Sequence, residues 1–264
     1  MTSPAASIGR RHMFIPDTQI KPGVNTDHIE AAANCAVDML PDVIVLAGDW
    51  FDMPSLSSWD KKKKSFEGRK YVEDIKSGND ALERFCAPIR KEIARRKRGK
   101  RKAWNPELHV TLGNHEQRIE RAVEEARELE CLMSYDDFDF EKHGFTVHDY
   151  LVPVIIDGVA YSHFYTSGPM NRPIGNARLM LQRLHMSALC GHTQPRDIAF
   201  GQRIDGTRMT AIMGGIFYTH DEGYLSAQQN TDRTWSGIWV LNQVRDGSFD
   251  ELPLSIDYLM RKYG

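Results

Sequence analysis

The stretch Asp42-Val43-Ile44-Val45-Leu46-Ala47-Gly48-Asp49-Trp50-Phe51-Asp52 decides the fold class of this chain. Its first half runs through β-branched and apolar residues without polar alternation, which is typical of a strand buried on both faces. Gly48 then permits a tight turn, and Asp49 follows the strand directly. The stretch therefore indicates an α/β protein that carries a carboxylate where a buried strand gives way to a loop.

The segments around this stretch alternate between strand and helix patterns. Apolar residues at helical spacing indicate helices where polar caps precede them and glycine or proline follows. Short apolar runs indicate strands. In chain order, the first half predicts a strand at 12–16, a helix from Asn25 to about Leu40, the strand at 42–47, a helix from about Tyr71 to Arg98, a strand at 108–112 and a helix from Gln117 to Met133.

The second half is richer in strand patterns, and Asp205-Gly206 is a two-residue hairpin signal. We expect two mixed sheets packed face to face with helices outside, in one domain over residues 1–264 with a basic helical insertion at about 53–106. The predicted elements are strands at 144–159 with a turn at Asp157-Gly158, at 160–164, 197–204, 207–213 and 236–241, and a helix at 176–185.

The N-terminal residues Met1 to Arg11 hold no apolar stretch of signal-peptide length, and no later apolar run is long enough to span a bilayer. We therefore expect a cytoplasmic protein that does not enter a membrane. The four cysteines stand far apart without a Cys-x-x-Cys pair, which predicts reduced thiols and argues against a zinc knuckle. The oligomeric state stays open.

Charge is distributed unevenly along the chain, although the formal net charge is only -2. Residues 61–102 hold seventeen Lys and Arg against six Asp and Glu, of 34 and 36 in the whole sequence. This segment suggests contact with a nucleic acid or a nucleotide; the alternative is a solvated helical face. The aromatic residues that could stack on bases nearby are Trp50, Phe51, Trp59, Phe66 and Trp104.

Polar clusters follow several predicted strands, in the order Asp17, Gly48 to Asp52, Gly113 to Glu116, His163 and Gly191 to Gln194. Together they offer carboxylate, amide and imidazole ligands. Two divalent cations about 3.5–4 Å apart can hold both the attacking hydroxide and the leaving oxygen of a phosphoryl group if a carboxylate bridges them. Asp49 suits the bridge and Asp17 would serve one cation. The order predicts a two-metal phosphoester hydrolase.

The remaining clusters supply the second cation and the proton donor. Asn114, through its amide oxygen, would bind the second cation together with His163 and His192. His115 would point away from that cation toward the scissile oxygen. We assign it as general acid or transition-state stabiliser, oriented by Asp52.

Two further residues are candidates for substrate binding. Arg118 could hold a phosphate in a bidentate clamp, or form an ion pair on its charged helix. His220 stands in a polar turn and could reach the substrate. The other histidines are expected to be structural or surface residues: His12, His28, His109, His143, His148 and His185.

The motifs, from roughly Met13 to Gln194, resemble the calcineurin-like metallophosphoesterases, whose pattern is Asp-x-His, Gly-Asp-x-x-Asp, Gly-Asn-His-Glu/Asp, a lone His and Gly-His-x-His. The resemblance extends to DNA-repair exonuclease-like and phage or bacterial branches. It implies a four-layer α/β/β/α sandwich of two mixed sheets flanked by helices. It also implies a binuclear site, often with manganese and with magnesium as an option, and these roles: Asp17, Asp49, Asn114, His163 and His192 as metal ligands, with His115 and Asp52 as the catalytic pair.

The chain departs from this pattern at two positions. Gln19 replaces the His of Asp-x-His, and Gln194 replaces the second His of Gly-His-x-His; in the family both belong to the same metal position. An amide oxygen is a harder and weaker donor than imidazole, so this first cation should bind loosely and favour manganese or magnesium over zinc or iron. The second site should fill tightly.

The leading functional prediction is a phosphodiesterase that acts on nucleic acid or nucleotides. A protein Ser/Thr phosphatase is the alternative, although that branch usually has Arg-Gly after Gly-Asp-x-x-Asp and this chain has Met53-Pro54. A third reading is a nucleic-acid-binding module with a weakened first metal site, which would have no need of His115 and Asp52. A small-molecule phosphodiesterase is the fourth.

Overall fold

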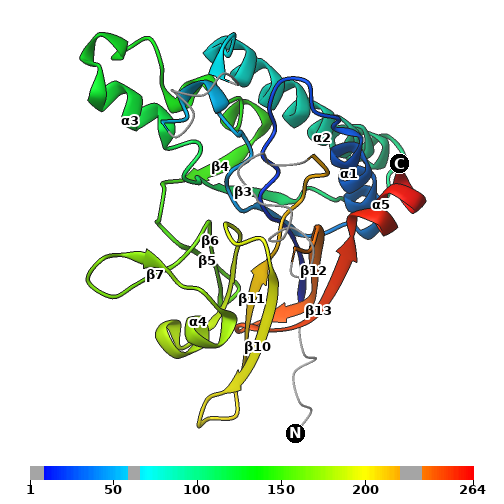
Figure 1. The fold of residues 1–264 in the computed structure, drawn as a ribbon. Coiled ribbons are helices and arrows are strands. Elements are labelled where there is room, and N and C mark those ends of the chain that lie inside the picture. Colours follow the sequence, from blue (N-terminus) through cyan, green and yellow to red (C-terminus); the bar gives the residue numbers. More distant parts are fainter. Residues whose placement is uncertain (1–8, 59–65, 221–233) are drawn as a thin grey trace, which may run out of the picture.

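The computed structural model describes residues 9–58, 66–220 and 234–264. Two β-sheets lie face to face and helices cover their outer faces, which gives the four layers α/β/β/α (Figure 1). The first sheet has the order β13-β12-β1-β2-β3-β4. Its strands are β1 Arg10–Ile15, β2 Val43–Leu46, β3 Glu107–Thr111, β4 Phe145–His148, β12 Gly237–Arg245 and β13 Ser248–Ser255.

The second sheet has the order β10-β11-β9-β6-β5, and a short hairpin of β7 and β8 stands apart from it. Three strands of this sheet, β6, β9 and β11, run parallel to one another, as β1, β2, β3 and β4 do in the first sheet. The bounds are β5 Val154–Ile156, β6 Val159–Ser162, β7 Thr166–Ser167, β8 Arg172–Pro173, β9 Ser187–Cys190, β10 Arg196–Gln202 and β11 Arg208–Gly214.

Helices α1, α2 and α5 pack on the first sheet, and α4 packs on the second. None of the helices in the described part of the chain is both long and apolar enough to cross a membrane. The helices are α1 Asp27–Met39, α2 Tyr71–Arg98, α3 Arg118–Glu125, α4 Ala177–Leu184 and α5 Ile256–Tyr263, with single 3-10 turns at Pro54–Leu56, Arg127–Leu129, Tyr135–Asp137 and Glu141–His143.

The position of β2 between two apolar layers explains why its sequence is apolar throughout. Val43 and Val45 face the second sheet, where they join the core between the two sheets. Ile44 and Leu46 face the opposite way, into the core beneath the helices. Successive strand residues point to opposite faces, so a strand between two apolar layers needs an apolar residue at every position.

Most predicted elements are present near their expected bounds, including α2, α4 and the hairpin of β10 and β11. The charged helix predicted from Gln117 to Met133 is shorter, because Ala126 leaves the helical conformation at φ -143° and ψ 90°. The strand predicted at 144–159 divides into β4 and β5, which belong to different sheets. The sequence patterns missed β7, β8, β9, β13 and α5.

Helix α2 is a core element as well as a basic segment. Leu82, Phe85 and Ile89 are buried in the core beneath the helices. Arg84 is paired with Asp27 and Glu30 of α1 at 2.7 and 2.8 Å. The helix therefore presents one apolar face to the sheet, and part of its positive charge is neutralised by the neighbouring helix.

The expectation that aromatic residues of this region stack on bases is wrong for three of them. Trp50, Phe51 and Trp104 are no more than 7% exposed and belong to the core. Their side chains stabilise the loops after β2 and before β3 and are closed to a ligand. Trp59 and the four lysines at 61–64 lie outside the described residues.

The basic cluster at 95–102 lies at the end of the first sheet where β2 and β3 begin. The indole Nε1 of Trp104, just beyond the cluster, donates to the carbonyl oxygen of Pro41, just before β2, at 2.7 Å. The predicted metal ligands follow the opposite, carboxyl ends of these strands. The basic cluster and the predicted metal site therefore lie at opposite ends of strands β2 and β3.

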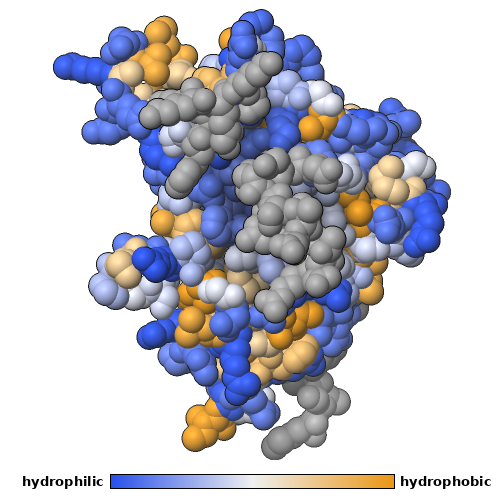
Figure 2. Space-filling view, in the orientation of Figure 1, coloured by the Kyte–Doolittle hydropathy of each residue, from blue (hydrophilic) through white to orange (hydrophobic). Residues whose placement is uncertain are grey.

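The visible surface in Figure 2 is largely polar. Hydrophobic side chains gather at its lower edge, near the end of the hairpin of β10 and β11, where Phe200 and Ile204 are exposed. A guanidinium group, that of Arg208, lies 5.5 Å above the Phe200 ring.

Candidate metal centre

The predicted ligands come from the loops that follow five strands. Asp17 follows β1, Asp49 follows β2, Asn114 follows β3, His163 follows β6 and His192 follows β9. Neighbouring parallel strands end at the same edge of a sheet, so each sheet brings its own set of ligands to one place. The two sets meet where the sheets face each other.

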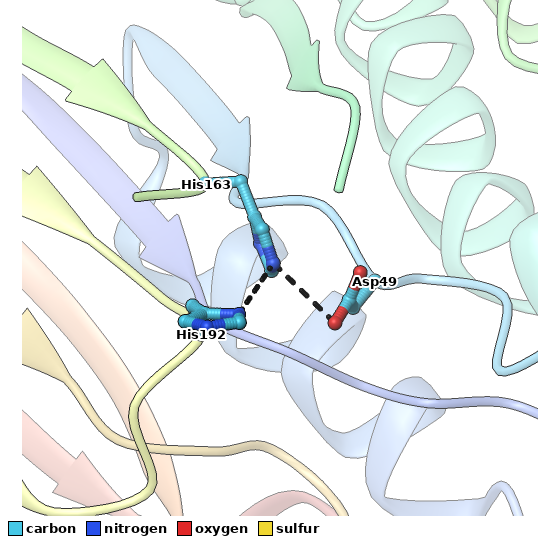
Figure 3. A group of neighbouring side chains, drawn as sticks. All are labelled: Asp49, His163 and His192. Atoms are coloured by element: carbon cyan, nitrogen blue, oxygen red, sulfur yellow. Dashed lines mark hydrogen bonds and ion pairs between the residues drawn. The ribbon is translucent and has the colours of Figure 1, made fainter. Parts of the chain in front are cut away.

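His163 is the centre of this group and is fully buried. Its Nδ1 donates to the carbonyl oxygen of Ala47 at 2.7 Å, which directs Nε2 into the site. Around Nε2 lie three further polar atoms. These are Asn114 Oδ1 at 3.0 Å, His192 Nδ1 at 3.2 Å and Asp49 Oδ2 at 3.4 Å, and Figure 3 shows two of these side chains converging on the ring.

The donor set fits a divalent cation. Carboxylate oxygen, amide oxygen and imidazole nitrogen all carry lone pairs, and one imidazole N–H cannot satisfy three acceptors at once. Ligand atoms of Asp49, His163 and His192 all lie within 4.8 Å of one another. An Nδ1 bonded to a backbone carbonyl is also the arrangement that metal-binding histidines usually show.

Two glycines let the ligand loops approach the carboxylates closely. A Cβ on Gly113 would lie 2.2 Å from Asp49 Oδ1, and a Cβ on Gly191 would lie 2.2 Å from Asp17 Oδ1. The space is used by backbone hydrogen bonds, since the N–H of His192 donates to Asp17 Oδ1 at 2.8 Å. A larger residue at either glycine would displace a predicted metal ligand.

Glu116 has a structural role that its place in the sequence motif did not reveal. Its carboxylate is fully buried and accepts three backbone N–H groups. Oε2 accepts from Asp49 at 2.9 Å and from Gly113 at 2.8 Å, and Oε1 accepts from Phe51 at 2.9 Å. Glu116 thereby ties the loop after β2 to the loop after β3, and both carry predicted ligands.

His115 and Asp52 lie together at the side of this group. His115 Nδ1 is 2.9 Å from Asp52 Oδ1 and 2.9 Å from the Asp52 carbonyl oxygen. Its other nitrogen, Nε2, lies 3.8 Å from Asp49 Oδ2 and 3.0 Å from a guanidinium nitrogen of Arg118. Lys21 Nζ contacts Asp52 Oδ2 at 3.1 Å. The imidazole is therefore held by Nδ1 and presents Nε2 to the site.

The pKa values in the site reflect burial and close opposite charges. Burial raises the pKa of Asp17 to about 7 and lowers that of His192 to about 4. Burial opposes charge on His163 as well, but the Asp49 carboxylate raises its pKa to about 10. Burial favours a protonated Asp52, yet the bond to His115 lowers its pKa to about 2. A proton on His163 and a cation compete for the same lone pair, so metal binding should release protons.

The two glutamines occupy different environments. Gln19 is 5% exposed, its N–H donates to the Asp49 carbonyl oxygen at 2.8 Å, and its buried Oε1 has no hydrogen-bond partner among the described residues. An unpartnered buried oxygen of this kind suits a cation ligand. Gln194 is partly exposed, and its carbonyl oxygen accepts from the N–H of Trp235 at 3.3 Å.

The structure places His220 beside Tyr218, with stacked rings whose centroids are 4.7 Å apart. This segment adjoins the site, because the N–H of Phe217 donates to the carbonyl oxygen of Asp17 at 2.7 Å. The side chain of Arg118 is not free to bind a phosphate with both terminal nitrogens. Its NH1 donates to the backbone carbonyl oxygens of Asp52, at 2.6 Å, and of Met53, at 3.1 Å.

No protein family model matches the sequence. The Gene 54 protein of Mycobacterium phage D29 is 26% identical over 201 residues, which cover 72% of this chain and 71% of that protein. Among solved structures, YfcE, a phosphoesterase from E. coli, is 14% identical with a TM-score of 0.40, covering 93% of this chain and 99% of its own. A second solved structure is 13% identical with a TM-score of 0.33. None of these similarities is close enough to define a family.

Proposed function

We propose that this protein is a metal-dependent phosphoesterase that hydrolyses phosphodiester bonds. The observation that carries the proposal is the group around His163 Nε2, where ligand atoms of Asp49, Asn114 and His192 lie within 3.4 Å of one nitrogen. A second imidazole, that of His115, faces the same carboxylate from the side. Metal ligands and a proton donor next to each other are what metal-assisted hydrolysis requires.

Two divalent cations would bind here, manganese or magnesium by the donor chemistry. Asp49, Asn114, His163 and His192 would hold one cation. Asp17, Gln19 and Gln194 would hold the other, with Asp49 as the bridge. Such cations polarise a phosphoryl oxygen and lower the pKa of water, which supplies the nucleophile.

The residues of the chain then divide the remaining work. Asp52 holds Nδ1 of His115 in its protonated form, so that Nε2 is the nitrogen that exchanges a proton with the ester. Burial lowers the pKa of His115, but Asp49 and Asp52 outweigh burial and raise it. In its protonated form His115 can deliver the Nε2 proton to the leaving oxygen, which takes the electron pair of the broken P–O bond.

The substrate that we propose is a nucleic acid or a nucleotide, on the evidence of the basic stretch from Lys61 to Lys102 in an otherwise acidic chain. The basic cluster at 95–102 within this stretch lies at the end of strands β2 and β3 that is opposite to the ligands. A polymer is long enough to contact both places, whereas a mononucleotide is not. Binding through this cluster would be salt-sensitive.

A panel of esters assayed with manganese tests the proposal. The panel consists of bis-p-nitrophenyl phosphate, p-nitrophenyl phosphate, single-stranded DNA and double-stranded DNA, each with the wild type and with His115→Ala. We expect diester hydrolysis that needs the metal and falls about 100-fold or more in the variant. Preference for the monoester would favour the protein phosphatase instead. Absence of metal-dependent hydrolysis of all four compounds would rule the function out.

The composition of the first metal position predicts unequal affinities. Gln19 and Gln194 offer amide oxygens, which bind first-row transition metals more weakly than imidazole does. Calorimetric titration with manganese should show one tight and one weak site. The double substitution Gln19→His with Gln194→His should tighten the weak site and leave the tight site unchanged. Two equally tight sites in the wild type would contradict this assignment.

A further inference from the structure

Arg118 is the first residue of α3, and its side chain reaches back across the site. NH1 donates to the carbonyl oxygens of Asp52 and Met53, at 2.6 and 3.1 Å, in the loop after β2. Only 14% of the side chain is exposed. Because both partners are backbone atoms of one loop, the guanidinium group is fixed before any substrate arrives.

The second terminal nitrogen of this guanidinium group points into the site. NH2 lies 3.0 Å from His115 Nε2, which is the nitrogen left available after Asp52 engages Nδ1. His115 Nε2 in turn lies 3.8 Å from Asp49 Oδ2. An ester oxygen that hydrogen-bonds to His115 Nε2 in front of the Asp49 carboxylate is therefore within reach of Arg118 NH2.

We propose that Arg118 is a catalytic residue whose NH2 group donates a hydrogen bond to a phosphoryl oxygen of the bound ester. This inference rests on the proposed phosphoesterase function and names one more residue that touches the reacting group. NH2 carries two N–H donors, so a phosphoryl oxygen placed beside His115 Nε2 can accept from NH2 while NH1 stays on the backbone carbonyl oxygens.

The arrangement separates two tasks within one side chain. NH1 anchors the side chain to the backbone, and NH2 serves the substrate. This differs from a bidentate clamp, in which both nitrogens would contact the phosphate. Lysine could not perform both tasks, because its ammonium group is a single point and cannot reach the carbonyl oxygens and the substrate in the same geometry.

Arg121 provides a matched control on the same helix. Its NH2 donates to the carbonyl oxygen of Asn114 at 2.9 Å, so it also ties α3 to a ligand loop. This hydrogen bond goes to Asn114 rather than to His115, and the Arg121 side chain is more exposed than that of Arg118. A purely structural role of Arg118 should be shared by Arg121, whereas a role in contact with the ester should not.

The test compares Arg118→Ala, Arg118→Lys and Arg121→Ala in the full chain with manganese. We expect Arg118→Ala to lower kcat for the diester about 100-fold with a smaller change in KM, and Arg118→Lys to recover only part of this loss. Arg121→Ala should lose much less kcat than Arg118→Ala, because it touches only a backbone carbonyl oxygen of the Asn114 loop. Added guanidinium ion, well below denaturing concentration, should partly restore Arg118→Ala. Equal losses in Arg118→Ala and Arg121→Ala, without rescue, would overturn the proposal.

A binding measurement keeps this inference separate from the proposed function. Inorganic phosphate is titrated by calorimetry into each variant in the presence of manganese, with thermal unfolding as a control for folding. Arg118→Ala should bind phosphate about 10-fold more weakly, and Arg121→Ala should bind it normally. Unchanged phosphate affinity in Arg118→Ala refutes the role of Arg118 even if the wild type hydrolyses no ester.

Discussion

At the scale of single residues, the site depends on buried charges that are held by backbone atoms. Glu116 and Asp49 illustrate this, because each carboxylate accepts N–H groups from the loop that carries the other residue. The N–H of Asp49 donates to Glu116, and the N–H of His115 donates to Asp49 Oδ1 at 2.9 Å. This exchange holds Asp49 in a left-handed conformation at φ 48°. Loss of either carboxylate would release both loops.

Glu116→Gln should weaken metal binding without unfolding the protein. The amide has nearly the same shape, but its NH2 group would face a backbone N–H and its charge is lost. We expect about 10- to 100-fold lower manganese affinity, the usual effect of removing a group that orients metal ligands. Calorimetric titration measures this. Glu92→Gln is the control. The Glu92 carboxylate is also buried and accepts from Arg95 and Arg96 on α2, and this variant should bind manganese normally.

His28 should make stability depend on pH. Burial lowers its pKa from 6.5 to about 4, so the unfolded chain takes up a proton before the folded one as pH falls. This contribution is full above pH 6.5 and is lost as pH decreases toward 4. Between pH 7 and 5 the loss is about 2 kcal/mol by linkage. Denaturant unfolding of His28→Gln should show a correspondingly shallower pH dependence, and parallel curves for the two proteins would contradict the assignment.

At the scale of elements, α2 links the outer helical layer to the loop that carries Asp49 and Asp52. Phe51 packs directly against the helix at Gly78, and the indole Nε1 of Trp50 donates to the Gly78 carbonyl oxygen at 3.1 Å. The helix continues through Pro88, although proline in a helix interior costs about 3 kcal/mol. Phe85, Cys86 and Ile89 near this proline are buried in the core.

Gly78→Ala should destabilise the protein even though alanine favours helices. A Cβ at this position would lie 2.0 Å from the Phe51 ring, so the ring and its loop must move. We expect a loss of about 1–3 kcal/mol in unfolding free energy, together with weaker manganese binding. Gly175→Ala is the control, because a Cβ there meets nothing within 4 Å. Equal unfolding free energies of the two variants would show that the Phe51 ring can move without a loss of stability.

At the scale of the whole molecule, the site joins the two sheets. Asp17, Asp49 and Asn114 extend from strands of the first sheet, whereas His163 and His192 extend from strands of the second. A cation held by both sets acts as a link between the layers. Because the unfolded chain lacks this arrangement, binding free energy adds to the stability of the folded state.

Manganese should therefore raise the melting temperature. At a concentration about 100 times the dissociation constant, one site contributes about 2.7 kcal/mol, which corresponds to about 5–10 °C for a chain of this size. Differential scanning calorimetry in manganese and in EDTA measures the shift. Asp49→Asn should abolish most of it. A wild-type melting temperature that is the same in manganese and in EDTA would argue against a site shared by both sheets.

The sequence by itself determined the elements whose signals are local. The uninterrupted apolar run of β2, the helical spacing of α2 and the turn of the hairpin of β10 and β11 depend on neighbouring residues, so they could be predicted. The order of polar clusters after strands also indicated which side chains would meet. The end of α3 and the division of residues 144–159 between two sheets depend on packing against distant segments, and the predictions failed there.

Only the tertiary structure decided which side chains are buried, and against what. The sequence shows that residues 50, 51 and 104 are aromatic. Only the packing of α2 on the first sheet shows that Trp50, Phe51 and Trp104 are buried and closed to ligands. Glu116 gained its role because two loops 67 residues apart bring their N–H groups to one carboxylate. The basic cluster at 95–102 could be counted from the sequence, whereas its distance from the site follows from strand direction. Contacts between residues far apart in the chain leave no periodic signal, so spacing alone cannot reveal them.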